Sequence, residues 1–514
     1  MLTRRSTFLR RAAQPLLARA TLPKRALRTT TPAQVVGPLA MGVGVACVAY
    51  GVKLLLQTAR NPEFQEAMRA APKAAADAAA GARQRAQRSR APPEQSAQQE
   101  QPIDAEAYFT TGVVGMDLGQ GAAEWAGACT AIVEHGVPRV VENELGSRST
   151  PNVLAFTDSG ELLVGQPAKK LLFSRTASAI LGHQALLGVR WGSDECAALL
   201  ASGALRFDVG EDEGGGGVAI HVRGTRHTPE ALCGRVLASL RASGEAALGG
   251  RSVVAAVIGS PVLASEGELR ALEAAGRLAG IRRVTLMDEP VAAAAAAESE
   301  LGAEMARVDT LGVYSLGGRG FSFTVLERRE ADEGAAVGWG IAAARRVDGG
   351  GLEAIDSLLV ESLVAEFARE ETIDLSQDHL ALARLHDAAE SAKLELCSAG
   401  AASISLPFIT ADASGPKHME LTLSRARFDE LARPVLRGTL QSCDEALAEA
   451  GVRAASLDAV LLVGGSARLP VVAELAAEHF GAAPLRLARP EEAVAIGAAR
   501  RAQELLELRY QNAG

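Results

Sequence analysis

The sequence has few aromatic residues and no paired cysteine motif. Phe, Trp and Tyr make up 4% of the 514 residues, so the core must consist largely of alanine, valine and leucine. The six cysteines include no CxxC pair, and this spacing predicts neither a zinc site nor a secreted disulfide framework. The sequence lacks GxxxxGK(S/T), which excludes a P-loop nucleotide site. The net charge of −8 argues against nucleic acid as a default partner, because such binding needs a basic face.

Acidic residues are also absent from residues 1–34, where Arg and Lys recur among Ser and Thr. This composition is typical of a mitochondrial transit peptide, and a plastid transit peptide has the same features. A basic tail on a cytosolic protein is the alternative. A secretory signal fits poorly, because no apolar run follows the first charges. We therefore predict a mitochondrial protein.

Residues 35–57 contain a single charge, Lys53, near one end of the segment. Roughly 20 apolar residues suffice to cross a bilayer as a helix, so this segment predicts a transmembrane helix. A buried helix or an extended targeting segment is the alternative. The C-terminal flank is basic, which predicts an inner-membrane protein with its C-terminal part in the matrix. Residues 58–108 are rich in Ala and then in Gln, Arg and Pro, and they predict a tether without a core of its own.

From residue 109 onward, short apolar runs alternate with longer helical segments. The runs 112–119, 253–261, 309–318 and 457–467 are rich in small and apolar residues and contain or end in Gly, as buried strands that lead into tight turns do. Helices are predicted at 266–279, 353–371 and 430–450. This alternation predicts an α/β fold for residues 109–506, followed by a polar tail at 507–514.

Several stretches carry a resemblance to a known family. They read GVVGMDLG at 112–119, PRVVENELGSRSTPNVLAFTDSGELLVGQPAKK at 138–170, EAAGRLAGIRRVTLMDEPVAAAAA at 273–296, LPFITADASGPKHMELTLSRARFDEL at 406–431, LLVGGSARLPVV at 461–472 and PEEAVAIGAA at 490–499. In this order they resemble the nucleotide-binding domain of the seventy-kilodalton heat-shock chaperones, the DnaK-like family in its mitochondrial and bacterial form. The resemblance implies an actin-like, two-lobed ATPase fold with a central nucleotide cleft.

The resemblance also implies which residues serve that cleft. Asp117 matches the carboxylate that holds Mg²⁺ through water, and Lys169 and Glu289 match catalytic positions. Glycines let backbone N–H groups approach phosphate oxygens closely, although each glycine pair alone fits a simple tight turn equally well. The implied contacts to ATP or ADP are Gly119, Gly317, Gly318, Glu390, Lys393, Gly464, Gly465, Ser466, Arg468 and Glu491.

Other positions depart from the family. The first hairpin reads DLGQGAAEWAGAC, about five residues longer than DLGTT and without its threonines. The second hairpin reads SLGGRGFSF where the family has DLGGGTFD, so Ser315, Gly320 and Ser322 replace two acids and a threonine. Leu394 replaces an arginine that stacks on adenine. These losses predict weak or no ATP binding, and they make ATP hydrolysis doubtful.

The function expected from the sequence is therefore that of a degenerate chaperone-like domain. It would be tethered to the membrane through residues 35–57 and would act as a scaffold or accessory subunit of a larger mitochondrial assembly or of import or folding machinery. The family continues into a peptide-binding domain, whereas this chain ends at Gly514, so no peptide clamp is expected in cis. The alternative is a slow ATP-hydrolysing chaperone that assists protein folding.

Overall fold

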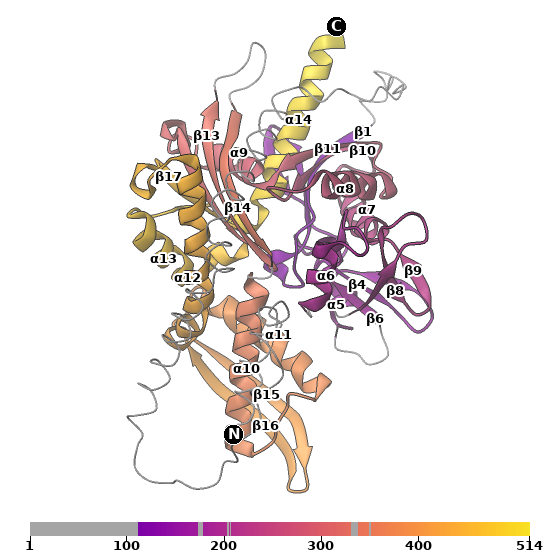
Figure 1. Ribbon diagram of the computed structural model, residues 1–514, viewed down its shortest axis with the longest axis vertical. Helices are drawn as coiled ribbons and strands as arrows, with labels where there is room; N and C mark the ends of the chain where they lie inside the picture. The colour runs from indigo at the N-terminus through magenta and orange to yellow at the C-terminus, as the bar shows by residue number, and fades with distance from the viewer. Residues whose placement is uncertain are drawn as a thin grey trace, which may run out of the picture. The chain divides into compact units, whose positions relative to one another are not determined.

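Two five-stranded sheets organise the part of the chain that the structure describes (Figure 1). The computed structural model describes residues 111–172, 178–202, 205, 207–329, 338–348 and 351–513, all within one unit of the chain. The first sheet has the order β11-β10-β1-β2-β3, and the second has the order β14-β13-β12-β17-β18. We call the parts built around them lobe I and lobe II.

Lobe I is a mixed sheet with helices on both faces and two small three-stranded sheets beside it. Its strands are β1 (Thr111–Asp117), β2 (Cys129–Glu134), β3 (Val137–Val140), β4 (Val153–Phe156), β5 (Leu162–Val164), β6 (Ser178–Leu181), β7 (Asp208–Glu211), β8 (Val218–Val222), β9 (Thr225–His227), β10 (Ser252–Ser260) and β11 (Arg283–Asp288). Its helices are α5 (Gln166–Lys169), α6 (Asp194–Ala201), α7 (Pro229–Ala247), α8 (Glu266–Leu278) and α14 (Ala493–Ala513).

Alternate residues of β1 face opposite helices. Val114 and Met116 are fully buried in the core that contains α7 and α8. Val113 packs on the other side with Ala498 and Ala502 of α14. Since successive side chains of a strand point to opposite faces, a strand covered on both sides must be apolar throughout. This explains why β1 and β10 appear in the sequence as continuous apolar runs.

Lobe II repeats this arrangement around the second sheet. Its strands are β12 (Thr310–Leu316), β13 (Gly320–Arg329), β14 (Gly338–Asp348), β15 (Ala401–Asp412), β16 (Gly415–Ser424), β17 (Ala459–Val463) and β18 (Leu485–Arg486), and its helices are α9 (Glu289–Leu301), α10 (Leu352–Glu371), α11 (His379–Leu396), α12 (Arg425–Ala450) and α13 (Pro470–Phe480). Tyr314 and Leu316 of β12 face the core with α10 to α13, while Leu311 and Val313 face α9. The hairpin β15–β16 packs on α11.

Helices α9 and α14 cross between the two sheets, and the crossing depends on a glycine. A Cβ at Gly497 would lie 1.8 Å from the carbonyl oxygen of Ala292, so only glycine lets the backbones approach this closely. Helix α9 lies on the lobe II sheet and α14 lies on the lobe I sheet. The pair therefore connects the lobes.

The predicted elements agree with the structure except at some boundaries. The helix predicted at 430–450 begins at Arg425, because the Ser424 side chain accepts a hydrogen bond from the Arg427 N–H as an N-cap. The polar residues from 507 to 513 continue α14. Across the described residues, no helix is long and apolar enough to cross a membrane. The transit peptide, the span at 35–57 and the tether lie outside these residues and stay predictions.

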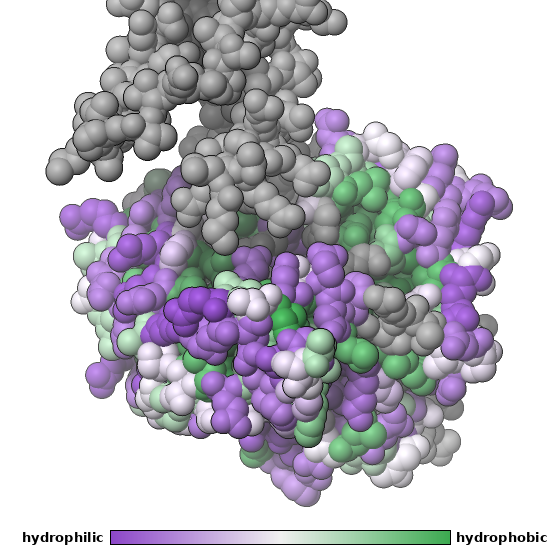
Figure 2. All heavy atoms as spheres, turned by 90° about the horizontal axis from the view of Figure 1, so that it is seen from below, coloured by the Kyte–Doolittle hydropathy of each residue, from purple (hydrophilic) through white to green (hydrophobic). Residues whose placement is uncertain are grey.

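The surface seen in Figure 2 is mostly hydrophilic, with hydrophobic residues in small groups between the polar ones. Large monomeric domains usually expose scattered apolar side chains of this kind. This face therefore offers a partner mainly charged and hydrogen-bonding groups.

Candidate functional site

Residues from both lobes meet at a small cavity beside the end of β1. Asp117 ends β1, and Glu289 begins α9. The cavity measures about 80 Å³. Of the residues that the sequence assigns to the site, it is lined by Asp117, Gly119, Glu289, Gly317, Gly318, Gly464 and Glu491. The fold thus brings residues from five separate motifs to one place.

Two of the acids that line this cavity, Asp117 and Glu289, hold a proton more strongly than usual. Burial raises the pKa of Asp117 to about 6, opposed by the Gly119 N–H, which donates to its Oδ1 at 2.9 Å. Burial and then the charge of Asp117 raise the pKa of Glu289 to about 8, opposed by Arg346. Because each charge disfavours the other, the pair keeps a proton near neutral pH.

Lys169 does not lie at this cavity. It ends the short helix α5, and its ammonium donates to Glu390 of α11 at 2.5 Å. Both side chains are largely buried and line a second, larger cavity of about 680 Å³. The lysine assigned to catalysis and the glutamate assigned to ribose binding therefore neutralise each other across 221 residues of sequence.

Lys393, the second residue assigned to ribose, is buried inside lobe II. Its ammonium donates to both carboxylate oxygens of Asp356, at 2.6 and 2.7 Å. Its exposed fraction is only 1%, so Asp356 supplies the charge that a buried ammonium requires. The ammonium also lies 5.6 Å from the ring centroid of Trp125.

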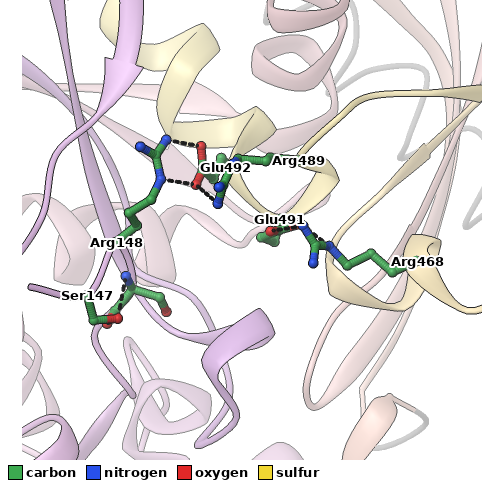
Figure 3. Close-up of polar contacts among 7 residues, drawn as sticks. Ser147, Arg148, Arg468, Arg489, Glu491 and Glu492 are labelled. Carbon is green, nitrogen blue, oxygen red and sulfur yellow. Dashed lines mark hydrogen bonds and ion pairs between the residues drawn. The ribbon is translucent and has the colours of Figure 1, made fainter. Parts of the chain in front are cut away.

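The residues assigned to the adenosine side are engaged by the chain itself. The Ser466 hydroxyl donates to the Leu316 carbonyl at 2.7 Å, and Arg468 pairs with Glu491 at 3.1 Å. Figure 3 shows this pair beside Glu492, which accepts from Arg148 through two bonds of 2.7 Å. Each charged side chain in this group therefore has a partner of opposite charge within the protein.

Trp125 is one of the residues of this site that the sequence did not reveal, with Arg346 and Asp348. It lies in the lengthened first hairpin, in the 3-10 turn Glu124–Ala126, and its exposed fraction is 7%. A Cβ placed on Gly465 would lie 2.2 Å from the Trp125 Cβ. The sequence did carry a signal for it, because a tryptophan within the lengthened hairpin is unusual in a chain with few aromatic residues.

Trp125 lines two cavities. It lines the 80 Å³ cavity with the acids, and it lines a third cavity of about 390 Å³ together with Leu394 and Arg468. Leu394 and Arg468 are positions that the resemblance assigns to the adenine side. Trp125 therefore lies next to both cavities, as do Gly127 and Glu491.

The metal and nucleotide positions can be tested against these residues. Ser315, Gly320 and Ser322, which replace two family acids and a threonine, line the small cavity with Asp117. In the described part of the chain, no group of three or more His, Cys, Asp or Glu is arranged to hold a metal ion. A cavity of about 80 Å³ is far below the roughly 300–1000 Å³ of pockets that hold small molecules.

A family model described as Hsp70 protein matches residues 113–507. The chain belongs to the Hsp70 family. This match, together with the two sheet-based lobes, confirms the resemblance and the actin-like α/β fold. The chain is thus a nucleotide-binding domain of the chaperone-type ATPase kind, and members of the Hsp70 family generally bind ATP or ADP with Mg²⁺.

Proposed function

We propose that this Hsp70-type domain is a pseudo-ATPase that binds ATP or ADP weakly or not at all and serves as a scaffold. The observation that carries the proposal is the small volume of the cavity, about 80 Å³, which both hairpins line together with Trp125. A domain of this fold with a filled cleft retains its surface for protein partners while losing its ligand. Its role is that of an accessory subunit of a larger assembly or of import or folding machinery.

The chemistry of the cleft supports the same proposal. Mg²⁺ prefers oxygen ligands and is usually bound through carboxylates, and Ser315 supplies no charge where the family has an acid. Loss of one preorganised electrostatic group typically lowers a rate by about 10²–10³. Here two acids and three threonines are missing together, so turnover falls far below that of a complete family member.

We also propose that the domain is attached to the mitochondrial inner membrane and faces the matrix. The acid-free residues 1–34, the apolar residues 35–57 and the basic flank after them support this location. Co-purification from solubilised mitochondria is the direct test. We expect the chain to migrate with one large assembly, and migration of the whole pool as a free monomer would contradict the scaffold role.

Nucleotide affinity is tested by calorimetric titration of the purified full-length protein with ADP and ATP. We expect no heat of binding below about millimolar nucleotide. A submicromolar dissociation constant would contradict the proposal.

One observation favours a second function, a slow ATPase that assists protein folding. Asp117 and Glu289 still line the same cavity, as an inherited catalytic site would require. A magnesium-dependent ATPase that Lys169→Ala or Glu289→Ala abolishes would establish this alternative. We expect the purified protein to show none, and no residual activity that responds to either substitution.

A further inference from the structure

Trp125 belongs to lobe I by sequence and to lobe II by packing. The hairpin that carries it connects β1 to β2, which are neighbours in the lobe I sheet. Its side chain nevertheless lies in the core cluster of lobe II, with Leu316, Phe321 and Leu352. A side chain that crosses between lobes in this way links them by burial of a large aromatic surface.

Gly465 and Lys393 of lobe II form the surface on which this tryptophan packs. At Gly465 any side chain would meet the Trp125 Cβ at 2.2 Å and its carbonyl oxygen at 2.7 Å, so glycine is required there. The Lys393 ammonium, held in place by Asp356, lies 5.6 Å from the centre of the ring, within the range of a cation–π interaction. The Trp125 side chain therefore fits closely against Gly465, and its ring faces a cation.

The backbone of the first hairpin is held by its own hydrogen bonds. The N–H groups of Gln120 and Gly121 donate to the Ala126 carbonyl, at 3.0 and 2.8 Å. A Cβ at Gly318 of the second hairpin would lie 2.9 Å from the Gly121 Cα. The two hairpins therefore lie in close contact at Gly121 and Gly318, which places Trp125 directly beside the second hairpin.

A buried asparagine keeps the hairpin in this shape. The Asn152 side chain is fully buried, and its Nδ2 donates to the carbonyls of Leu118 and Gly119 at 2.7 and 3.0 Å. The Asn152 N–H donates to the Gly121 carbonyl at 3.0 Å. These three hydrogen bonds fix the conformation of the first hairpin relative to lobe I.

We infer that Trp125 is a built-in occupant of the cleft, which takes the place of a flat heteroaromatic ligand and joins the lobes without one. This inference rests on the proposed function and names the residue that excludes nucleotide. It follows that removal of the side chain should join the cavities of about 80 and 390 Å³ and leave a slot for an indole or a purine.

The test is chemical rescue of Trp125→Gly in the purified full-length protein. Thermal unfolding is followed for wild type and variant, alone, with millimolar indole and with millimolar ADP. We expect the variant to unfold at least about 5 °C lower than wild type, because loss of a buried Trp side chain is among the most destabilising substitutions. Indole should restore part of this loss, and ADP should raise the unfolding temperature of the variant but not that of wild type.

Trp339→Gly is the matched control. Trp339 is also buried in lobe II, at 9% exposed, but it packs on Arg328 away from the cleft. It should lower the unfolding temperature without creating a response to ADP. If Trp125→Gly does not fold, Trp125→Leu provides a smaller change. It too should lower the unfolding temperature, and indole and ADP should raise it again.

An unchanged unfolding temperature in Trp125→Gly, or a variant that responds to neither indole nor ADP, would overturn the inference and leave the proposed function intact. A Lys169-dependent ATPase in the wild-type protein would instead overturn the proposed function, while indole rescue would still decide whether Trp125 fills the slot.

Discussion

Asp117 and Glu289 are acids whose surroundings favour the protonated form. The native state therefore holds a proton that the unfolded chain releases over part of the pH range. For Glu289 that range runs from its ordinary pKa of 4.5 up to about 8. In this interval the native state binds more protons than the unfolded state, so the free energy of unfolding falls as pH rises.

Glu289→Gln should make the protein more stable at alkaline pH and leave it nearly unchanged near pH 5. Gln is neutral at every pH, so the variant avoids the buried charge. We expect a gain of about 1–2 kcal/mol in the free energy of unfolding above pH 8, since one pKa unit corresponds to about 1.4 kcal/mol and water in the cleft reduces the full effect. Denaturant unfolding from pH 5 to pH 9 measures it, with the exposed Glu478→Gln as control. A gain in the free energy of unfolding that is largest at pH 5 would contradict a raised pKa at Glu289.

The pair Lys169–Glu390 makes a second prediction for single residues. Lys169→Met and Glu390→Gln should each destabilise the protein by about 1–3 kcal/mol, because each removes one member of a largely buried ion pair. The double variant should lose less than the sum of the two. The exposed pair Arg501–Glu504, at 41% on both sides, should show a much smaller coupling in the same double-mutant cycle. Strict additivity at Lys169 and Glu390 would show that the pair does not form in solution.

At the scale of elements, helices α9 and α14 and the first hairpin each depend on a close backbone approach. Gly497 permits the helices to cross at Ala292, and Gly465 permits the hairpin to lie against lobe II. Both contacts join segments about 200 or more residues apart in the chain. Both contacts depend on the absence of a side chain. Any side chain at either glycine would displace the backbone of the segment packed against it.

Gly497→Ala should destabilise the protein by at least about 2 kcal/mol, because its Cβ would overlap the Ala292 carbonyl. Gly438→Ala is the matched control, since Gly438 lies inside α12 with open space around it. There alanine should stabilise by about 0.5–1 kcal/mol through its better helix propensity. Thermal or denaturant unfolding of both variants measures the contrast, and equal effects would argue against the helix crossing.

At the scale of the whole molecule, the described domain and the N-terminal segments make separate predictions. We expect alkaline carbonate to leave the full-length protein in the membrane pellet, because residues 35–57 are long and apolar enough to span a bilayer. The domain should resist added protease in mitoplasts, because the basic flank predicts a matrix location. Release into the supernatant would contradict the anchor, and digestion in mitoplasts would contradict the orientation alone.

The sequence by itself determined the family, the α/β alternation and most element positions. These depend on local patterns, such as apolar runs that end in glycine, and on the order of motifs along the chain. It also identified the lengthened first hairpin. It further showed that Ser315, Gly320 and Leu394 stand where the family has an acid, a threonine and an arginine. Each of these features is a property of neighbouring residues.

Only the tertiary structure decided what the cleft contains. No local pattern indicates that Lys169 pairs with Glu390, that Lys393 pairs with Asp356, or that Trp125 lies against Gly465. Each contact joins residues that the fold alone brings together. Burial and pairing are set by packing of the two lobes, and for that reason these contacts appear only in three dimensions.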